Sequence, residues 1–407
     1  MRKVLEGVKV VELTTHAAAP MTGRILADLG ADVIKIEAPS GDNQRLFGLS
    51  CGAPVSDDEN PCFQLMNANK RGITLNLKMQ EGRELLYDLL KDANIFFTNT
   101  RRQALEKLQI TYEDLAPKFP HLIYGHISGL GLKGEEAKLP GYDITAYWAR
   151  GGGLADFALE GNGPIMTPYA VGDHTTSLAL AAGLTSSLYK QKLTGEGEYV
   201  LVSLYGVSVY VNSLILVPAQ DCYNDKWPKS KYSPLTPITN TYICADGEMI
   251  TLTILDYERD WAKFCKMIQC EDLIDDERYN TRAEAKKLEN SKYLVDLISD
   301  IFKQHDRAYW MAELSKYDLP YGKTVHLSEV TKDPLAWENG YLSEFTFENG
   351  NKCVIPNTPI QFRENVAAPC GPCPHLGEHS REIMRELGYG EEKIQKLLEM
   401  GASTSYR

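Results

Sequence analysis

Positive charge is scarce in this 407-residue chain, which has 43 Lys and Arg against 55 Asp and Glu and a formal net charge of −12 at pH 7. Nucleic acids and anionic membrane surfaces are bound through excess positive charge. The charge balance therefore argues against both kinds of partner. Apolar residues make up 43% and charged residues 24% of the chain, an ordinary globular composition with length enough for two domains.

Long hydrophobic runs are also missing, and no apolar signal segment opens the chain. A long uncharged stretch at residues 199–220 is interrupted by glycine and polar residues and ends near Pro218. A membrane span needs about 20 predominantly apolar residues, so we expect a buried strand followed by a buried helix here. The nine cysteines are an odd, scattered set, which is typical of a cytoplasmic protein without disulfides.

One segment departs from the acidic average. Residues 61–110 contain five acids and eight basic residues, namely Lys70, Arg71, Lys78, Arg83, Lys91, Arg101, Arg102 and Lys107. A solvated surface explains such a run, and a site for a small polyanion is the alternative.

Strand-like and helical patterns alternate in the first half of the chain. Residues 8–13 and 31–37 alternate like strands, and a helix between them begins at Pro20 and ends before Gly30. A capping box is expected at Thr111–Asp114. Further strands are expected at 73–77, 95–98 and 121–128, and a further helix at 81–93. This alternation predicts an α/β fold with a parallel sheet.

The pattern changes after about residue 220, where three prolines punctuate a polar linker. A hairpin that turns at Asp246–Gly247 is expected next. Helices are then expected at 261–268, 288–302, 307–316, 380–387 and 391–400. We therefore expect a large domain at 1–220, a smaller α+β domain at 225–328 and a C-terminal segment at 330–407.

Two motifs match known site patterns without the context that those sites need. Gly129–Gly134 fits G-x-G-x-x-G, but no amphipathic helix follows it, so we expect no dinucleotide site. Cys370–Cys373 has the spacing of a redox dithiol but lies in a proline-rich tail, so we favour a plain loop over a redox function. The seven histidines from His121 to His379 lack ligand spacing, and no metal site is predicted.

Asp173 lies at the start of a long segment rich in small residues, 168–183. Aspartate is a favoured N-cap residue because its side chain accepts the free N–H groups of a first turn. A carboxylate in this place can also be a nucleophile. Position alone favours the cap.

Several motifs must be taken together: Leu5–Leu13, Ala19 with Pro20, Leu26–Glu37, Asn69–Gly72 with Leu75–Lys78, and Gly172 with Asp173. Together they resemble the class III (formyl-CoA/carnitine type) CoA-transferases, and the tail from Leu376 to Tyr389 is similar to the family's C-terminus. Three further segments look most like the anaerobic 2-hydroxyacyl-CoA transferases, which act on phenyllactate or 2-hydroxyisocaproate. They are Asp57–Pro61, Gly141–Gly152 and Asp333–Asn339.

The resemblance implies a Rossmann-like large domain that holds both chain ends, an inserted small domain and a homodimer of interlinked rings. It also implies a cytoplasmic enzyme of amino-acid fermentation. A coenzyme A thioester would be its substrate, with no cofactor bound permanently.

Within this resemblance the family's nucleophile falls on Asp173, which outweighs the N-cap interpretation. The CoA-contacting positions fall on Ala17, Ala18, Leu75, Asn76, Leu77, Lys78, Asn99, Thr100, Arg101 and Lys107. CoA carries phosphate charge, and three of these residues are cations of the locally basic segment. Relatives specific for formate and oxalate carry an Arg where this chain has Ala38, and a glycine run where it has 228–234. Oxalate is therefore not expected as a substrate.

The implied mechanism is covalent. Ionised Asp173 attacks an acyl-CoA of the 2-enoyl type, and mixed-anhydride and enzyme-thioester intermediates pass CoA to an (R)-2-hydroxy carboxylic acid. N–H groups at the helix start and at Gly151–Gly153 are expected to stabilise the tetrahedral species. The helix N-terminus is expected to keep the pKa of Asp173 low.

Alternatives remain at this point. A 2-methylacyl-CoA racemase of the same fold would use a Gly-His-Asp segment, but this chain has Gly141-Tyr142-Asp143, and a tyrosine of pKa ~10 is a poor base. A non-catalytic CoA-binding protein is disfavoured only by Asp173. Asp143 is expected either to polarise or position the substrate or to make a structural hydrogen bond. The aromatics Tyr142, Tyr147, Trp148 and Tyr169 suit an aryl or branched acid, although such residues are more often core.

Overall fold

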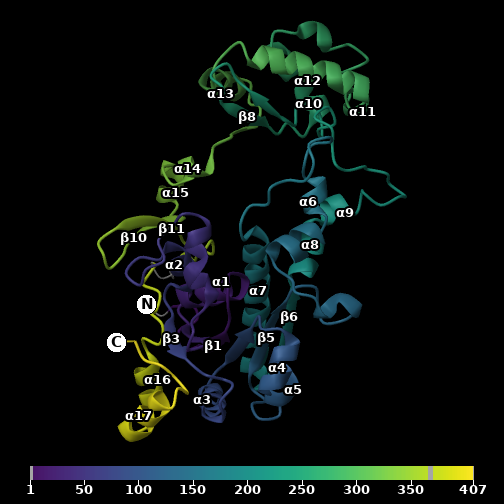
Figure 1. Cartoon of the computed structure of the whole chain (residues 1–407). Helices are drawn as coiled ribbons and strands as arrows, with labels where there is room; N and C mark the ends of the chain where they lie inside the picture. The colour runs from purple at the N-terminus through teal and green to yellow at the C-terminus, as the bar shows by residue number, and fades with distance from the viewer. Residues whose placement is uncertain (1–2, 365–369, 407) are drawn as a thin grey trace. The chain divides into compact units, whose positions relative to one another are not determined.

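The computed structural model describes residues 3–364 and 370–406 (Figure 1). The chain divides into two compact units. The larger unit comprises residues 1–153, 167–216 and 334–407, and the smaller comprises 154–166 and 217–333. The larger unit thus contains both ends of the chain.

A six-stranded parallel sheet forms the centre of the larger unit. Its strands follow the order β3-β2-β1-β4-β5-β6. They are β1 (Lys9–Leu13), β2 (Asp32–Glu37), β3 (Arg71–Thr74), β4 (Ile95–Thr98), β5 (Ile123–Ser128) and β6 (Tyr199–Ser203). This is the doubly wound order, in which ligands bind beyond the carboxyl ends of the strands where the order reverses, here between β1 and β4. The predicted Rossmann-like α/β fold with a parallel sheet is confirmed.

Helices cover both faces of this sheet, because adjacent strand residues point to opposite faces and both faces are apolar. Val10 and Phe97 pack with α1 (Ala18–Asp28) and α7 (Val171–Thr194). Val11 and Phe96 belong to the core on the other face. That core includes residues of α3 (Gln80–Leu90), α4 (Arg102–Leu108), α5 (Tyr112–Leu115), α16 (Ser380–Glu386) and α17 (Glu391–Glu399).

The remaining elements of the larger unit are short. They are α2 (Pro61–Asn67), α8 (Leu204–Val211), α9 (Ser213–Leu216), α15 (Pro334–Glu338), the hairpin β10 (Leu342–Thr346) and β11 (Lys352–Pro356), the 3-10 helices η1 (Asn43–Ser50) and η2 (Glu135–Lys138), the π-helix η3 (Asp143–Ala149), and α6 (Gly153–Asp156), which begins at the unit boundary. The predicted capping box at Thr111–Asp114 is confirmed at the start of α5.

The prediction for residues 199–220 is only half right. A strand and a helix do form there as β6 and α8, but the apolar side chains are not all buried. Tyr210 is 81% exposed and Leu214 is 90% exposed. Apolar spacing shows that a segment needs a partner surface but not whether the same chain supplies it. No helix among the described residues is long and apolar enough to cross a membrane.

The smaller unit has its own core, beneath a three-stranded antiparallel sheet. The predicted hairpin is confirmed, and Gly247 supplies a positive φ of 80° at its turn. The elements are β7 (Thr241–Ile243), β8 (Met249–Leu252), β9 (Tyr321–Lys323), α10 (Tyr257–Met267), η4 (Glu271–Leu273), α11 (Arg282–Ala285), α12 (Leu288–Phe302), α13 (Arg307–Lys316) and α14 (Leu327–Val330). The helices predicted at 288–302 and 307–316 match α12 and α13.

Candidate active site

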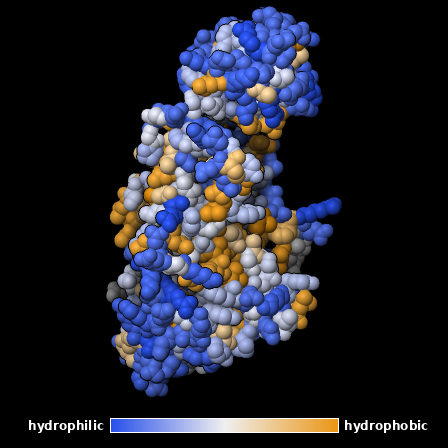
Figure 2. Space-filling view, turned by 90° about the vertical axis from the view of Figure 1, so that its right-hand side faces the viewer, coloured by the Kyte–Doolittle hydropathy of each residue, from blue (hydrophilic) through white to orange (hydrophobic). Residues whose placement is uncertain are grey.

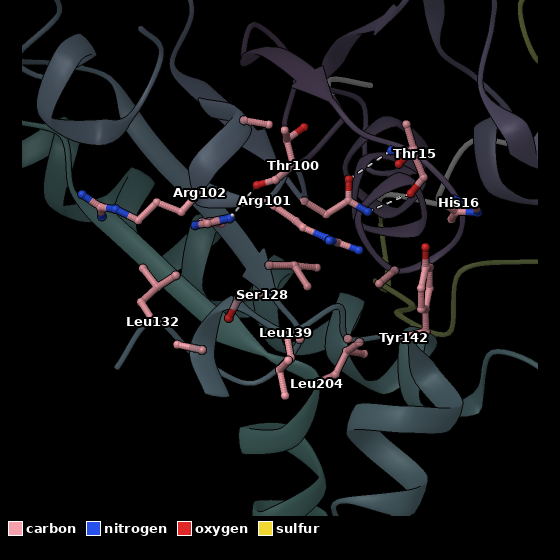
Figure 3. A pocket seen from close by; sticks show the side chains of 18 of the residues that line it. Thr15, His16, Thr100, Arg101, Arg102, Ser128, Leu132, Leu139, Tyr142 and Leu204 are labelled. Carbon is pink, nitrogen blue, oxygen red and sulfur yellow. Dashed lines mark hydrogen bonds between the residues drawn. The ribbon is translucent and has the colours of Figure 1, made fainter. Parts of the chain in front are cut away.

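A cavity of about 390 Å³ lies in the larger unit, beyond the carboxyl ends of β1, β4 and β5. The turn after β1 contributes Thr15–Ala18, and the segment after β4 contributes Asn99–Ala104. The loop after β5 lines a third side, and Asp173 of α7 and Leu204 of α8 complete the wall. Figure 3 shows the cavity with labelled residues from the turn after β1, the segment after β4 and the loop after β5. The cavity therefore occupies the switch point at which this type of sheet binds its ligands.

Asp173 lies in the first turn of α7 but does not cap it. The N-cap is Ala170, in the left-handed conformation with φ 57°, and it makes no side-chain capping bond. Asp173 lines the cavity, and its carboxylate accepts no hydrogen bond from residues 3–364 or 370–406. The interpretation of Asp173 as an N-cap is therefore wrong, and its carboxylate is free to react.

The pKa of Asp173 is raised to about 7 by burial and, secondarily, by the charge of Asp143. The expectation of a low pKa from the helix dipole is therefore wrong. Burial withdraws water from the charged form, and a second carboxylate nearby disfavours it further. Near neutral pH, Asp173 is therefore divided between its protonated and its ionised form.

Asp143 begins η3, and its buried side chain faces the start of α7. Its Oδ1 atom accepts a hydrogen bond of 3.0 Å from the backbone N–H of Asp173. Burial raises the pKa of Asp143, although the N–H groups of Asp173 and Gly172 and the Trp148 indole lower it. A Cβ atom at Gly172 would overlap with this carboxylate and with the Tyr147 ring. The geometry thus supplies the structural hydrogen bond considered above, while a contact of Asp143 with substrate stays a prediction.

The predicted donors for the tetrahedral species are largely engaged. The N–H of Asp173 is donated to Asp143, and the N–H of His174 is donated to the carbonyl of Ala170. Gly151–Gly153 are not among the residues that line the cavity, and the N–H of Gly152 is donated to Ala149. The free N–H groups at a helix start can be occupied by side-chain acceptors. Here the Asp143 carboxylate accepts the N–H of Asp173.

Half of the ten predicted CoA-contacting residues line the cavity with Asp173. They are Ala17, Ala18, Asn99, Thr100 and Arg101. The Asn99 amide accepts from the Thr15 N–H at 3.0 Å and donates to the Thr15 carbonyl at 2.8 Å (Figure 3). Asn99 therefore holds the turn that follows β1.

Leu75–Lys78 and Lys107 do not line the cavity. Leu75 and Leu77 are core residues, and the Asn76 side chain donates to the carbonyl of Gly401 at 3.4 Å. Their contact with CoA remains a prediction.

Two cations of the basic segment are neutralised within the fold. Lys70 is buried 2.7 Å from Glu12, and Arg71 forms ion pairs with Asp32, Glu382 and Glu386. These two residues do not contribute to an anion site.

Arg101 and Arg102 have different surroundings. Arg101 forms no ion pair within the described part of the chain, and Figure 3 shows it directed across the cavity towards Tyr142. Arg102 points the other way in Figure 3 and is bound to Glu106 and Glu113. Arg101 is therefore the arginine placed to meet an anionic ligand.

Several lining residues were not identified from the sequence. His16 adopts a positive φ of 63°, and its ring lies edge-on to that of Tyr142 at 6.0 Å. His126 of β5 lies 3.1 Å from the carbonyl of Thr100, and burial lowers its pKa. The only sequence signal for His16 was its place directly before Ala17 in the first turn. The end of β5 and the segment after it contribute Ser128, Gly129, Leu132, Ala137, Lys138 and Leu139.

The G-x-G-x-x-G segment and the Cys-x-x-Cys segment have the local structures that the sequence predicts. Gly129–Gly134 is followed by the short η2 rather than by an amphipathic helix. Cys370–Cys373 is a loop of free thiols. Burial raises the pKa of both thiols, that of Cys373 to about 12, whereas a redox dithiol needs a lowered pKa.

Comparison with known proteins identifies the family. Residues 5–380 match the model of CoA-transferase family III. The chain is 41% identical over 391 residues, covering 96% of this chain and 97% of the relative, to the (R)-2-hydroxy-4-methylpentanoate CoA-transferase of Clostridioides difficile. It is 35% identical over 397 residues, covering 97% and 96%, to the cinnamoyl-CoA:phenyllactate CoA-transferase of Clostridium sporogenes. A CaiB/BaiF family protein from Brucella suis has a similar structure, with TM-score 0.81, 28% identity and coverage of 95% of this chain and 100% of that one. The chain therefore belongs to CoA-transferase family III and is a CoA-transferase.

Proposed function

We propose that this enzyme moves CoA from an acyl-CoA of the 2-enoyl type to an (R)-2-hydroxy carboxylic acid. The relatives at 41% and 35% identity are named for such acids and match nearly the whole chain. The observation that carries the proposal is the carboxylate of Asp173, which lines the cavity without a hydrogen-bond partner among the described residues.

The proposed reaction begins when a carboxylate oxygen of Asp173 attacks the thioester carbonyl of the acyl-CoA. The C–S bond breaks, CoA leaves as a thiolate, and a mixed anhydride remains on Asp173. The thiolate then attacks the aspartyl carbonyl and releases the first acid, which leaves an enzyme thioester.

In the second half, the carboxylate of the incoming hydroxy acid attacks that aspartyl thioester and forms a new mixed anhydride. The released thiolate attacks the hydroxyacyl carbonyl, so that the product thioester leaves and Asp173 is free again. One CoA thioester and one free carboxylate are consumed and one of each is formed, so no net proton transfer and no further cofactor is required.

The anionic part of CoA is proposed to contact Arg101, with Ala17, Ala18 and Thr100 along the same wall. Arg101 is a suitable contact because it lacks an ion pair within the described residues and points into the cavity (Figure 3). Guanidinium groups match phosphate oxygens with paired donors. Leu75–Lys78 and Lys107 are proposed to contact parts of CoA that extend beyond the cavity.

We also propose that the enzyme is a cytoplasmic homodimer. Figure 2 views the side on which α8 and α9 lie and shows hydrophobic residues gathered there. The exposed apolar side chains of α7, α8 and α9 include Leu178, Tyr189, Leu193, Tyr210, Val211 and Leu214. Contiguous apolar surface on a soluble protein typically marks an interface. All nine cysteines are free thiols, in keeping with a reducing compartment.

The test is direct detection of CoA esters by mass spectrometry. The purified protein is mixed with cinnamoyl-CoA or isocaprenoyl-CoA and a panel of (R)-2-hydroxy acids, and a new 2-hydroxyacyl-CoA is expected. The Asp173→Ala variant is expected to form none, and full activity in that variant would overturn the covalent mechanism. A protein that forms no new ester but places deuterium from heavy water at the α-carbon of a 2-methylacyl-CoA would be a racemase.

A further inference from the structure

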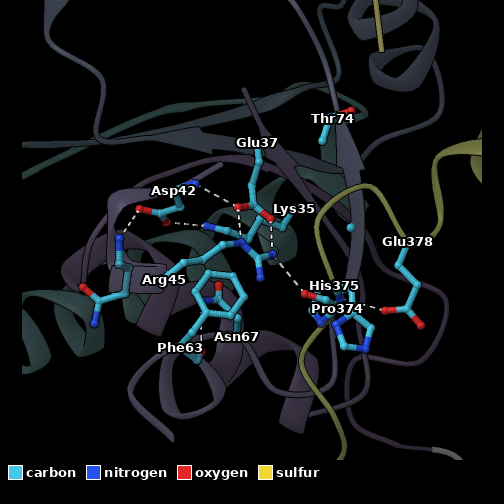
Figure 4. Close-up of polar contacts among 12 residues, drawn as sticks. Lys35, Glu37, Asp42, Arg45, Phe63, Asn67, Thr74, Pro374, His375 and Glu378 are labelled. Atoms are coloured by element: carbon cyan, nitrogen blue, oxygen red, sulfur yellow. Dashed lines mark hydrogen bonds and ion pairs between the residues drawn. The ribbon is translucent and has the colours of Figure 1, made fainter. Parts of the chain in front are cut away.

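A cluster of four buried charged residues lies beside the cavity wall. Glu12, Lys35, Asp42 and Lys70, here called the buried charge cluster, have side chains that are almost wholly inaccessible to solvent. Lys70 lies 2.7 Å from Glu12, and Lys35 lies 3.1 Å from Asp42 and 3.9 Å from Glu12. Figure 4 shows Lys35 and Asp42 next to the pair of Glu37 and Arg45. None of the four cluster residues lines the cavity.

Three members of the cluster bind the backbone of the turn between β1 and α1, or of the first turn of α1 that follows it. Lys35 Nζ donates to the carbonyl of Thr14 at 3.0 Å. Asp42 Oδ1 accepts the N–H of His16 at 3.1 Å, and Lys70 Nζ donates to the carbonyl of Pro20 at 2.7 Å. The charged side chains therefore hold the backbone at His16 and on both sides of it.

This turn needs such support. It contains no glycine, yet His16 adopts the left-handed conformation with φ 63°, which residues with a Cβ rarely adopt. The same turn supplies Thr15–Ala18 to the cavity. A relaxed His16 would turn the backbone of 15–17 and so change the wall that the ligand meets.

Stability alone does not account for the cluster, because apolar residues of the same volume often stabilise a core as well or better than buried ion pairs. Apolar side chains could not hold the polar backbone atoms of the turn. Burial lowers the pKa of Lys35, but Asp42, Glu12 and Glu37 outweigh it and raise that pKa overall. Burial raises the pKa of Asp42, but Lys35 and the N–H groups of Gln44 and His16 lower it overall. The Lys35–Asp42 pair is therefore charged at neutral pH.

We propose that Lys35, Asp42 and Lys70 are positioning residues for the CoA-transferase reaction. They fix the backbone at Thr14, His16 and Pro20, and so pre-form the wall at residues 15–18 against which CoA binds. The proposal rests on the proposed role of this cavity as the CoA site.

The test compares Asp42→Asn with a matched control, Asp28→Asn. Asp28 is equally buried in the same unit and is bound to Arg24 at 3.0 Å, but it touches neither the turn nor the cavity. Binding of coenzyme A is measured by calorimetry. The KM for the acyl-CoA and kcat are measured in transferase assays, and stability is measured as the midpoint of thermal unfolding. Both variants are expected to unfold at lower temperature. Only Asp42→Asn is expected to weaken CoA binding and raise KM, on the order of tenfold or more.

Equal binding constants and KM values in the two folded variants would overturn the proposal. Failure of the wild-type protein to bind coenzyme A would instead contradict the proposed role of the cavity as the CoA site. If Asp42→Asn does not fold, hydrogen exchange of the wild-type protein tests the proposal instead. The His16 amide is expected to be protected without CoA, because a buried carboxylate holds it. Fast exchange of that amide in the free protein, with protection only on CoA binding, would show that the turn is not pre-formed.

Discussion

The Oδ1 atom of Asp143 accepts a hydrogen bond of 3.0 Å from the backbone N–H of Asp173. This contact joins two carboxylate residues that are thirty positions apart in the sequence. It fixes the backbone of the proposed nucleophile, and it also brings a second acidic group close to the reacting carboxylate. Asp143 therefore positions Asp173 and adds to the effect of burial, which is the main cause of the raised pKa of Asp173.

The activity of the enzyme is expected to fall in acid. Asp173 attacks only as a carboxylate, and its pKa is about 7. Below that pH the ionised fraction falls about tenfold per pH unit, and kcat/KM is expected to follow it. The measurement is kcat/KM between pH 5 and 9 in a buffer of constant ionic strength. A flat profile down to pH 5 would show that Asp173 is not the titrating nucleophile or that its pKa is not raised.

Asp143→Asn is expected to shift the fall of kcat/KM in acid to lower pH. The amide oxygen of asparagine can accept the same N–H bond from Asp173, but the charge that helps to raise the pKa of Asp173 is gone. Asp173 stays buried in this variant, so its pKa should remain partly raised. The pH profile of the variant is compared with that of the wild type at equal folded fraction. A midpoint that does not move would mean that burial alone sets the pKa of Asp173.

Arg101→Ala is expected to weaken CoA binding, and Arg385→Ala is its control. Arg101 lines the cavity, whereas Arg385 forms an exposed ion pair with Glu391 and does not line it. Loss of a hydrogen bond to a charged group costs about 1.5–3 kcal/mol, which is roughly tenfold or more in Kd. Loss of an exposed ion pair costs about 0–1 kcal/mol of stability and should leave binding nearly unchanged. Calorimetric titration with coenzyme A checks both, and equal effects would remove Arg101 from the proposed site.

Gly172→Ala is expected to disturb both stability and activity. The added methyl group would overlap with the Asp143 carboxylate and the Tyr147 ring, so that the Asp143–Asp173 contact must shift. Overpacking of this kind typically costs about 1–3 kcal/mol of unfolding free energy. Gly390→Ala is the control, because φ is −70° there and the methyl group meets nothing within 4 Å. Thermal unfolding and transferase assays of both variants test this, and a fully active Gly172→Ala enzyme would contradict it.

The thiols of Cys370 and Cys373 are expected to react slowly. Burial raises their pKa values, that of Cys373 to about 12, so little thiolate is present at neutral pH. Cys51 and Cys222 are exposed. Timed alkylation with iodoacetamide at pH 7.5, followed by peptide mass spectrometry, should label the exposed pair first. Preferential labelling of Cys373 would reopen the redox alternative.

Much of the fold was determined by local pattern. The strands at β1 and β4 and the helices α12 and α13 were predicted because apolar periodicity over 4 to 15 residues reflects which face each element buries. The parallel sheet followed from the alternation of these elements. The family motifs, which span nearly the whole chain, led to the CoA-transferase assignment and singled out Asp173.

The chemistry of the site was decided by the tertiary structure. Asp173 has a raised pKa because chain folding buries it and brings Asp143 to the same helix start, and neither effect is visible in residues 168–183. Lys70 belonged to a basic segment that predicted either a solvated surface or an anion site, yet it is buried and paired with Glu12, which lies 58 residues earlier. Likewise, the apolar residues of α8 looked buried and are partly exposed. Periodicity describes one segment at a time, whereas burial and charge pairing depend on distances between segments, and only the folded chain sets those distances.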